Sequence, residues 1–229
     1  MYIFYFNRDL VDNRKETLLL FTLYCVCIVI ARIMIDVPFQ LIPIILFTML
    51  ISLLLESRLA IIMSILMTLV SCIAVSGDKD FIVYFMLSGI FSAIFAKYTT
   101  ERSKVFPVAI LISLVSGLTA LSFGFLFEKS ISNDIVNNAV YAVLNSLLTV
   151  ALCIGTLPFW EAAFGIVTPI KMLDLTNPNN KLLRRLTIEA PGTYQHSLIV
   201  GNLAETAAYD VGADPTLARV GGYYHDIGK

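Results

Sequence analysis

The sequence predicts an all-α protein: a polytopic bundle of transmembrane helices, followed by a smaller helical part outside the membrane. Of the 229 residues, 58% are apolar and only 14% are charged, and the mean hydropathy is +0.81. Soluble domains are about 45–50% apolar and about 25% charged. The charges are also unevenly spread, because residues 17–160 carry 14 of the 33 and residues 161–229 carry 13. The middle of the chain is therefore predicted to lie in the membrane and the tail in water.

Six apolar stretches are long enough to be predicted as membrane spans. A spanning helix needs about 20 mainly apolar residues, because each residue adds 1.5 Å and the hydrocarbon core is about 30 Å thick. Charged and turn-forming residues separate the six stretches. They are roughly 17–35, 38–55, 58–76, 81–96, 105–127 and 136–158. Pro43 and Gly89 lie within two of them and are interpreted as packing features that a membrane helix tolerates.

Several classes of protein are disfavoured by what the sequence lacks. No ionisable side chain lies in the middle of a predicted span, so a channel or transporter ranks last among the functions considered. The four cysteines lie in apolar runs without a Cys-x-x-Cys pair, which predicts neither a disulfide framework nor a zinc site. A net charge of −1 gives no general attraction to nucleic acid, and no DNA or RNA partner is expected.

The positions of lysine and arginine predict which loops face the cytoplasm, because short cytoplasmic loops carry an excess of both. The most basic loop between spans is 97–104, and four more basic residues follow the sixth span: Lys171, Lys181, Arg184 and Arg185. Both regions are predicted to be cytoplasmic. Loops 77–80 and 128–134 hold acidic residues with one lysine each and are predicted to lie outside.

After the membrane region, the sequence predicts a linker and then two helices. Residues 1–16 form a juxtamembrane segment, 17–160 the bundle, and 161–192 a linker whose turn signals flank a short basic helix at about 180–189. From residue 193 to 229, Thr193 is predicted to cap a helix that ends near Val211, with Gly212 in a left-handed conformation after it. Asp214 and Pro215 then begin the second helix.

The two predicted helices carry the only histidines of the chain. His196 shares a face with apolar residues at helical spacing, so its imidazole is predicted to point at the core; these residues are Ile199, Val200, Leu203 and Ala207. On the second helix, His225 follows small residues at i−7, i−4 and i−3: Ala218, Gly221 and Gly222. Small residues allow helices to approach closely, which predicts that His196 meets the pair His225 and Asp226.

Two imidazoles and a carboxylate form a ligand set that suits a divalent ion such as Mn²⁺ or Fe²⁺, with positions left for water and phosphate oxygens. The alternative is that each histidine is an ordinary hydrogen-bonded core residue. The adjacent Asp226, with Gly228 and Lys229 close behind, favours the metal site over this alternative.

The same residues resemble a known family. The stretch EAPGTYQHSLIVGNLAE at 189–205, then Gly212-Ala-Asp-Pro, then YHDIGK at 224–229, is similar to the start of the HD hydrolase domain of bacterial seven-transmembrane-receptor HD proteins, the PgpH-type cyclic di-AMP phosphodiesterases. The resemblance implies a multi-pass protein of the bacterial cell membrane with a cytoplasmic HD-type domain. It also implies that His196, His225 and Asp226 ligate two divalent ions, that Lys229 helps to hold phosphate, and that cyclic di-AMP is hydrolysed to the linear dinucleotide.

The resemblance also shows two departures. Members of the family have an extracytoplasmic region before the bundle, which requires an odd number of spans. Either 38–55 is not a span, or an additional span lies hidden in 58–127, or the start of this chain is inserted differently. Their HD domain also continues past the His-Asp pair, so residues 193–229 correspond to its first part, and the 229 residues alone are expected to be inactive. The competing hypothesis is a catalytically silent membrane receptor module, or a remnant of one, that packs or forms homo-oligomers.

Overall fold

The protein is described by a computed structural model that covers residues 14–99, 101–127 and 133–228. Every regular element within these ranges is a helix, which confirms the predicted all-α class. The chain divides into two compact units, Met1–Ile166 and Val167–Lys229. We describe each unit by itself.

The first unit contains five helices, among the described residues, that are long and apolar enough to cross a membrane. Five of the six predicted spans are therefore confirmed by length and composition. The five helices are α3 (Arg14–Ile33), α5 (Ser57–Val75), α6 (Lys79–Ala96), α7 (Val105–Phe127) and α8 (Asn133–Phe164). The last of these runs through Pro158 and beyond the predicted end of the bundle at residue 160.

The second predicted span, 38–55, is wrong as a full-length span. It forms a one-turn 3₁₀ helix, η1 (Phe39–Leu41), and then an α-helix of 11 residues, α4 (Ile44–Leu54), which is only about 17 Å long. Pro43 stands between the two, where its missing N–H and its ring are incompatible with a continuous helix. The residue before a proline is also driven toward extended backbone, and Ile42 has ψ 126°.

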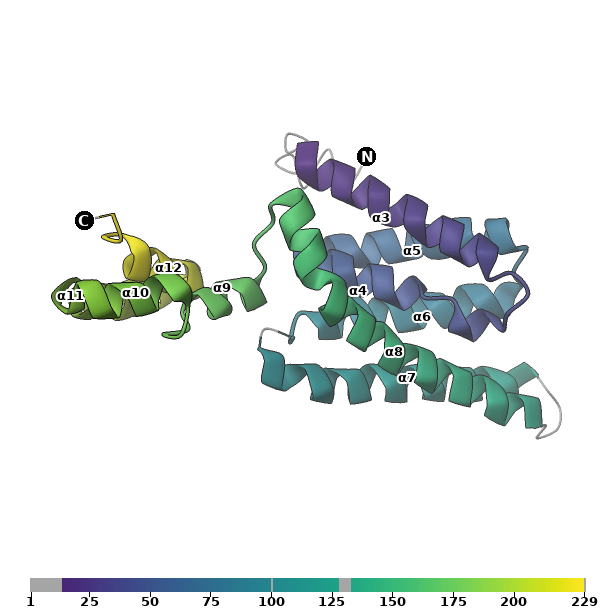
Figure 1. Cartoon of the computed structure of the whole chain (residues 1–229). Coiled ribbons are helices and arrows are strands. Elements are labelled where there is room, and N and C mark those ends of the chain that lie inside the picture. Colours follow the sequence, from purple (N-terminus) through teal and green to yellow (C-terminus); the bar gives the residue numbers. More distant parts are fainter. Residues whose placement is uncertain (1–13, 100, 128–132, 229) are drawn as a thin grey trace. The chain divides into compact units, whose positions relative to one another are not determined.

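The short helix α4 lies at the centre of the bundle, in contact with α3, α5, α6 and α8 (Figure 1). Ten of its eleven residues are buried. A helix that is apolar on all sides is stable only when it is enclosed in this way. Beside it, α5 and α6 pack so closely that a Cβ on Gly89 would lie 2.1 Å from Oγ of Ser64. Gly89 is thus a packing residue, as predicted, whereas Pro43 lies at the break between η1 and α4 and is the N-cap of α4.

A buried asparagine of α8 satisfies the backbone at this break. The Nδ2 group of Asn145 donates to the carbonyl oxygens of Gln40 at 2.8 Å and of Ile42 at 3.3 Å. Carbonyls at a helix break need such donors, because no water reaches them inside a bilayer. Asn145 therefore joins the broken segment to α8.

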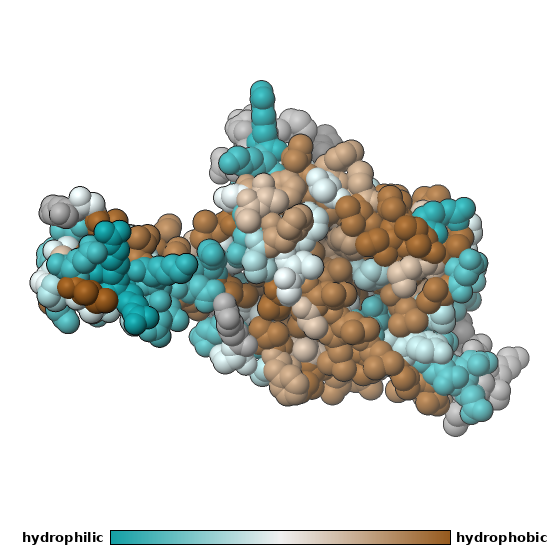
Figure 2. Space-filling view, viewed as in Figure 1, coloured by the Kyte–Doolittle hydropathy of each residue, from teal (hydrophilic) through white to brown (hydrophobic). Residues whose placement is uncertain are grey.

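The surface of the first unit is apolar on the view of Figure 2. Its helices expose large apolar side chains, among them Phe21, Ile73, Phe106, Leu118 and Leu148. Hydroxyl groups instead face inward and bond to their own helix, as Ser88 Oγ does to the Tyr84 carbonyl and Ser146 Oγ to the Ala142 carbonyl. An apolar exterior around a partly polar interior is typical of a multi-pass membrane protein.

Helices α7 and α8 pack against each other, only five residues of sequence separate them, and they run antiparallel (Figure 1). The start of α7 and the end of α8 consequently lie at the same end of the bundle. The basic loop 97–104 and residue 164 share that end, and the start of α6 at Lys79 lies at the opposite one.

The second unit consists of α9 (Pro169–Leu175), α10 (Lys181–Glu189), α11 (Pro191–Asp210) and α12 (Pro215–Tyr224). The short basic helix is confirmed, with Asn180 as its cap. Gly212 has φ +72°, and the carboxylate of Asp214 accepts from the first backbone N–H groups of α12, both as predicted. The predicted cap at Thr193 is wrong, because α11 already begins at Pro191, whose fixed φ suits a first helical position.

Candidate metal centre

The site is built on a close contact between α11 and α12, made by two glycines. A Cβ on Gly222 would lie 2.4 Å from Cα and 2.7 Å from N of Gly201, which leaves no room for any side chain. Small buried residues of α11 line this contact: Ser197, Gly201 and Ala208. The prediction of a close approach at small residues is confirmed for Gly222. Gly221 instead faces open space, since a methyl group added there would have nothing within 4 Å.

His196 does not point into a core within the described residues, and this part of the prediction is wrong. Its side chain is exposed, as are Ile199 (59%) and Leu203 (66%) on the same face. The helix turns a different face, the one bearing Ser197 and Gly201, toward α12. The reason is that the backbones approach most closely where side chains are smallest, so the glycine face makes the contact and the apolar face lies beside it.

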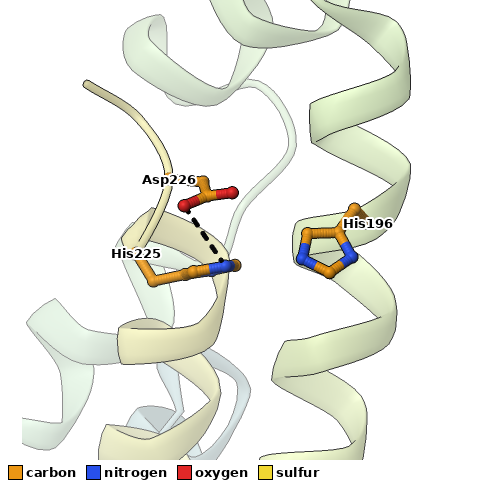
Figure 3. Close-up of side chains that lie close together, drawn as sticks. All are labelled: His196, His225 and Asp226. Carbon is orange, nitrogen blue, oxygen red and sulfur yellow. Dashed lines mark ion pairs between the residues drawn. The ribbon is translucent and has the colours of Figure 1, made fainter. Parts of the chain in front are cut away.

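The same contact brings three predicted ligands together. His196 projects from α11 toward His225 and Asp226, which directly follow α12 (Figure 3). The two imidazole rings lie 5.4 Å apart between centroids, tilted by 60°. One ligand atom from each of the three residues can be chosen so that all lie within 4.8 Å of one another. Two ligand atoms on opposite sides of an ion at about 2.1 Å would be about 4.2 Å apart, so the spacing is close to that of a metal site.

The orientation of His225 is fixed by the backbone. Its Nδ1 lies 2.8 Å from the carbonyl oxygen of Gly222, a distance at which the ring N–H donates to that carbonyl. The proton is thereby held on Nδ1, and the lone pair of Nε2 faces Asp226, whose Oδ1 is 3.5 Å away. A second hydrogen bond of this kind fixes the tautomer of most metal-binding histidines.

The donor set fits a divalent transition metal on its chemistry. Two neutral imidazoles and one carboxylate are ligands that Mn²⁺ and Fe²⁺ accept. His196 and His225 are exposed and Asp226 is half-buried, so water and substrate oxygens can reach the remaining positions. The fourth predicted site residue, Lys229, lies outside the described residues.

A polar network that the sequence analysis did not identify holds α11 and α12 together. Arg219 donates to the hydroxyl of Tyr223 at 3.0 Å and forms an ion pair of 3.2 Å with Glu205. The hydrogen bond to Tyr223, supported by Glu205, raises the pKa of Arg219 above its usual value. Tyr224 donates to the carbonyl of Leu175 on α9 at 2.8 Å, and burial raises the pKa of its phenol. Sequence spacing identifies Arg219 and Tyr223 as an i,i+4 pair on one helix. It does not identify Glu205 on α11 as the partner of Arg219.

The chain matches two family models. Residues 1–168 match the family described as a 7TM receptor with intracellular HD hydrolase, and residues 193–229 match the HD domain. No solved structure matches the chain.

Two bacterial phosphodiesterases are similar over most of the chain, and a third protein is similar over a smaller part of it. The cyclic-di-AMP phosphodiesterase PgpH of Bacillus subtilis is 36% identical over 196 residues, which cover 82% of this chain and 28% of that protein. The PgpH of Listeria monocytogenes is 31% identical over 184 residues, 79% of this chain and 26% of that protein. An uncharacterised protein of Synechocystis is 49% identical over 90 residues, 39% of this chain and 11% of its own length. The chain thus spans about a quarter of the length of the two PgpH relatives, and it belongs to the family of 7TM receptors with an intracellular HD hydrolase.

Proposed function

We propose that the protein containing this chain is a membrane-bound, metal-dependent phosphodiesterase that hydrolyses cyclic di-AMP to the linear dinucleotide. The observation that carries the proposal is the convergence of His196, His225 and Asp226 on one face of the α11–α12 contact. The substrate comes from the relatives, both of which are named cyclic-di-AMP phosphodiesterases. A catalytically silent receptor module is disfavoured, because the three ligand side chains are present and close together.

In this proposal, His196, His225 and Asp226 would hold the divalent ions, and Mn²⁺ or Fe²⁺ is the metal. A bound divalent cation supplies Lewis-acid chemistry, since it polarises phosphate oxygens and makes water a better nucleophile near neutral pH. The protein contributes orientation: the Gly222 carbonyl holds the ring of His225 with Nε2 free, and the glycine contact sets its distance from His196. Lys229 contributes a positive charge for a phosphate group.

The test uses the full-length protein, because three side chains are too few to hold two ions and the 229 residues alone are expected not to turn over substrate. Purified protein is stripped with a chelator and assayed with cyclic di-AMP before and after addition of Mn²⁺ or Fe²⁺. We expect hydrolysis to disappear on stripping and to return with either ion, with the linear dinucleotide as product. Unchanged hydrolysis after complete removal of metal would contradict the proposal, as would a metal-loaded protein that leaves cyclic di-AMP intact.

We further propose that the second unit is cytoplasmic. Two observations support this orientation: loop 97–104 is the most basic of the loops between spans, and it lies at the same end of the bundle as the last residues of α8. The basic residues Lys181, Arg184 and Arg185 follow in the second unit. Positive residues are retained on the cytoplasmic side.

Single cysteines test this orientation. The four cysteines of these 229 residues are replaced by alanine, and one new cysteine is introduced in each variant. Ser103→Cys places an exposed thiol just before the start of α7, and Asn133→Cys places one at the start of α8, at the opposite end of the helix pair. In intact cells, a membrane-impermeant maleimide is expected to label Asn133→Cys and to leave Ser103→Cys unlabelled until the cells are opened. The opposite pattern would reverse the topology.

A further inference from the structure

A small cavity lies at the end of the first unit where α6 begins and α7 ends, away from the basic loop. Its volume is about 80 Å³, and it is enclosed by residues of η1, α6, α7 and α8. The lining residues that matter for its chemistry are Phe39, Gln40, Asp80, Tyr84, Phe123 and Asn138. A single water needs about 10–15 Å³ of such space, so the cavity has room for an ion that keeps part of its hydration shell.

Three oxygen atoms at this cavity are buried and form no hydrogen bond of good geometry. They are Oε1 of Gln40, Oδ1 of Asp80 and the hydroxyl of Tyr84, which has the hydroxyl of Ser116 as a neighbour. The side chains of Gln40 and Tyr84 are almost fully enclosed, with exposures of 3% and 2%. Each unsatisfied buried polar atom is costly. The other such side-chain atoms among the described residues are all Ser or Thr hydroxyls, whereas this cavity gathers a carboxylate, an amide and a phenol oxygen. This grouping points to a ligand that provides what these oxygens lack.

The charge of the site selects the kind of ligand. Asp80 is half-buried and forms no ion pair among the described residues, although Lys79 and Asp78 precede it directly. An anion would be repelled by this carboxylate, and an apolar ligand would leave all three oxygens unpaired.

The number of carboxylates further narrows the ligand to a singly charged cation. Protein sites for Ca²⁺ are typically built from several carboxylates together with carbonyl oxygens. This cavity offers one carboxylate with neutral amide and hydroxyl oxygens, a set that balances one positive charge. We propose that the cavity binds a monovalent metal cation, Na⁺ or K⁺, with Asp80, Gln40 and Tyr84 as oxygen ligands. This binding site is separate from the His196, His225 and Asp226 cluster and does not depend on its chemistry.

The experiment measures thermal unfolding of the full-length protein in detergent, with choline chloride replaced stepwise by NaCl or KCl at constant ionic strength. A ligand that binds only the folded state raises the melting temperature in proportion to the logarithm of its concentration above the dissociation constant. We expect a rise of about 5 °C or more at a hundred times that constant with at least one of the two ions. Asp80→Asn, which keeps the shape of the side chain, should abolish the rise.

Asp78→Asn is the matched control, because it removes the same charge two residues before Asp80. The side chain of Asp78 is exposed and makes no capping hydrogen bond. This variant should respond like the wild type. Tyr84→Phe keeps the ring and the carboxylate but removes one ligand oxygen, and it should shift the midpoint of the response to about tenfold higher ion concentration. An equal response in Asp80→Asn and wild type would overturn the proposal. So would a folded wild type that responds to neither Na⁺ nor K⁺, or that responds only to Mg²⁺ or Ca²⁺.

Discussion

Replacing His225 or Asp226 by alanine in the full-length protein is expected to lower the rate of cyclic di-AMP hydrolysis by more than about 100-fold. Loss of residues that merely support metal ligands already costs 10- to 100-fold, and loss of a ligand should exceed this. The double substitution should be no worse than either single one, because residues that hold the same ions act as a unit and their losses do not add. Metal content should fall together with activity.

The control is Asp210→Ala, which removes an exposed carboxylate at the end of α11 without touching the cluster. This variant should keep its metal and its activity. Thermal unfolding of the membrane bundle should be the same in all the variants, since His225 and Asp226 belong to the other unit. An Asp226→Ala protein with full metal content and full hydrolysis would show that the His-Asp pair is a packing feature.

Most of the fold follows from apolar length and capping residues. Five long apolar runs become long helices because only a helix satisfies its own backbone over a span. The capping side chain of Asp214 and the positive φ of Gly212 can be predicted from the sequence, because both depend only on neighbouring residues. The proposals for the substrate and for the number of ions rest on family resemblance, because residue spacing carries no information about either.

The broken span was not predictable from composition alone. A buried core helix and a membrane span are equally apolar, and only the length of uninterrupted helix separates them. Pro43 was visible in the sequence, but its effect depends on whether a neighbour satisfies the freed carbonyls. Here Asn145, more than 100 residues later, does so. That pairing is a tertiary contact, and helical periodicity carries no information about it.

The contacts that build the candidate site were also not predictable from helical periodicity. The apolar face of α11 was predicted to face the core, but the contact with α12 uses the glycine face next to it. Gly201 lay inside a helical pattern without an evident role, which is a signal for close packing. The oxygens of this cavity were missed because Asp80 was assigned to the predicted outer loop 77–80 and Gln40 to a segment taken to be continuous helix.

Gly222→Ala is expected to disrupt the site, and Gly221→Ala is not. The added methyl group at position 222 would meet the backbone of Gly201 at 2.4 and 2.7 Å, and backbone atoms cannot rotate away. The helices must therefore separate, which costs about 1–3 kcal/mol of the stability of this unit as overpacking does elsewhere. The shift also moves the Gly222 carbonyl that orients His225, so the two histidines separate as well. A misplacement of about 1 Å can lower a catalysed rate about 100-fold.

Gly221→Ala makes the same chemical change one residue earlier in the same helix, on a face where nothing lies within 4 Å. It should leave hydrolysis and metal content unchanged and stabilise α12 by up to about 1 kcal/mol, because alanine favours the helix over glycine. Activity, metal content and thermal unfolding of both full-length variants are compared at saturating Mn²⁺. Wild-type activity in Gly222→Ala would show that the close contact of α11 and α12 does not set the distance between His196 and His225, and equal losses in both variants would show that helix α12 tolerates no change at either glycine.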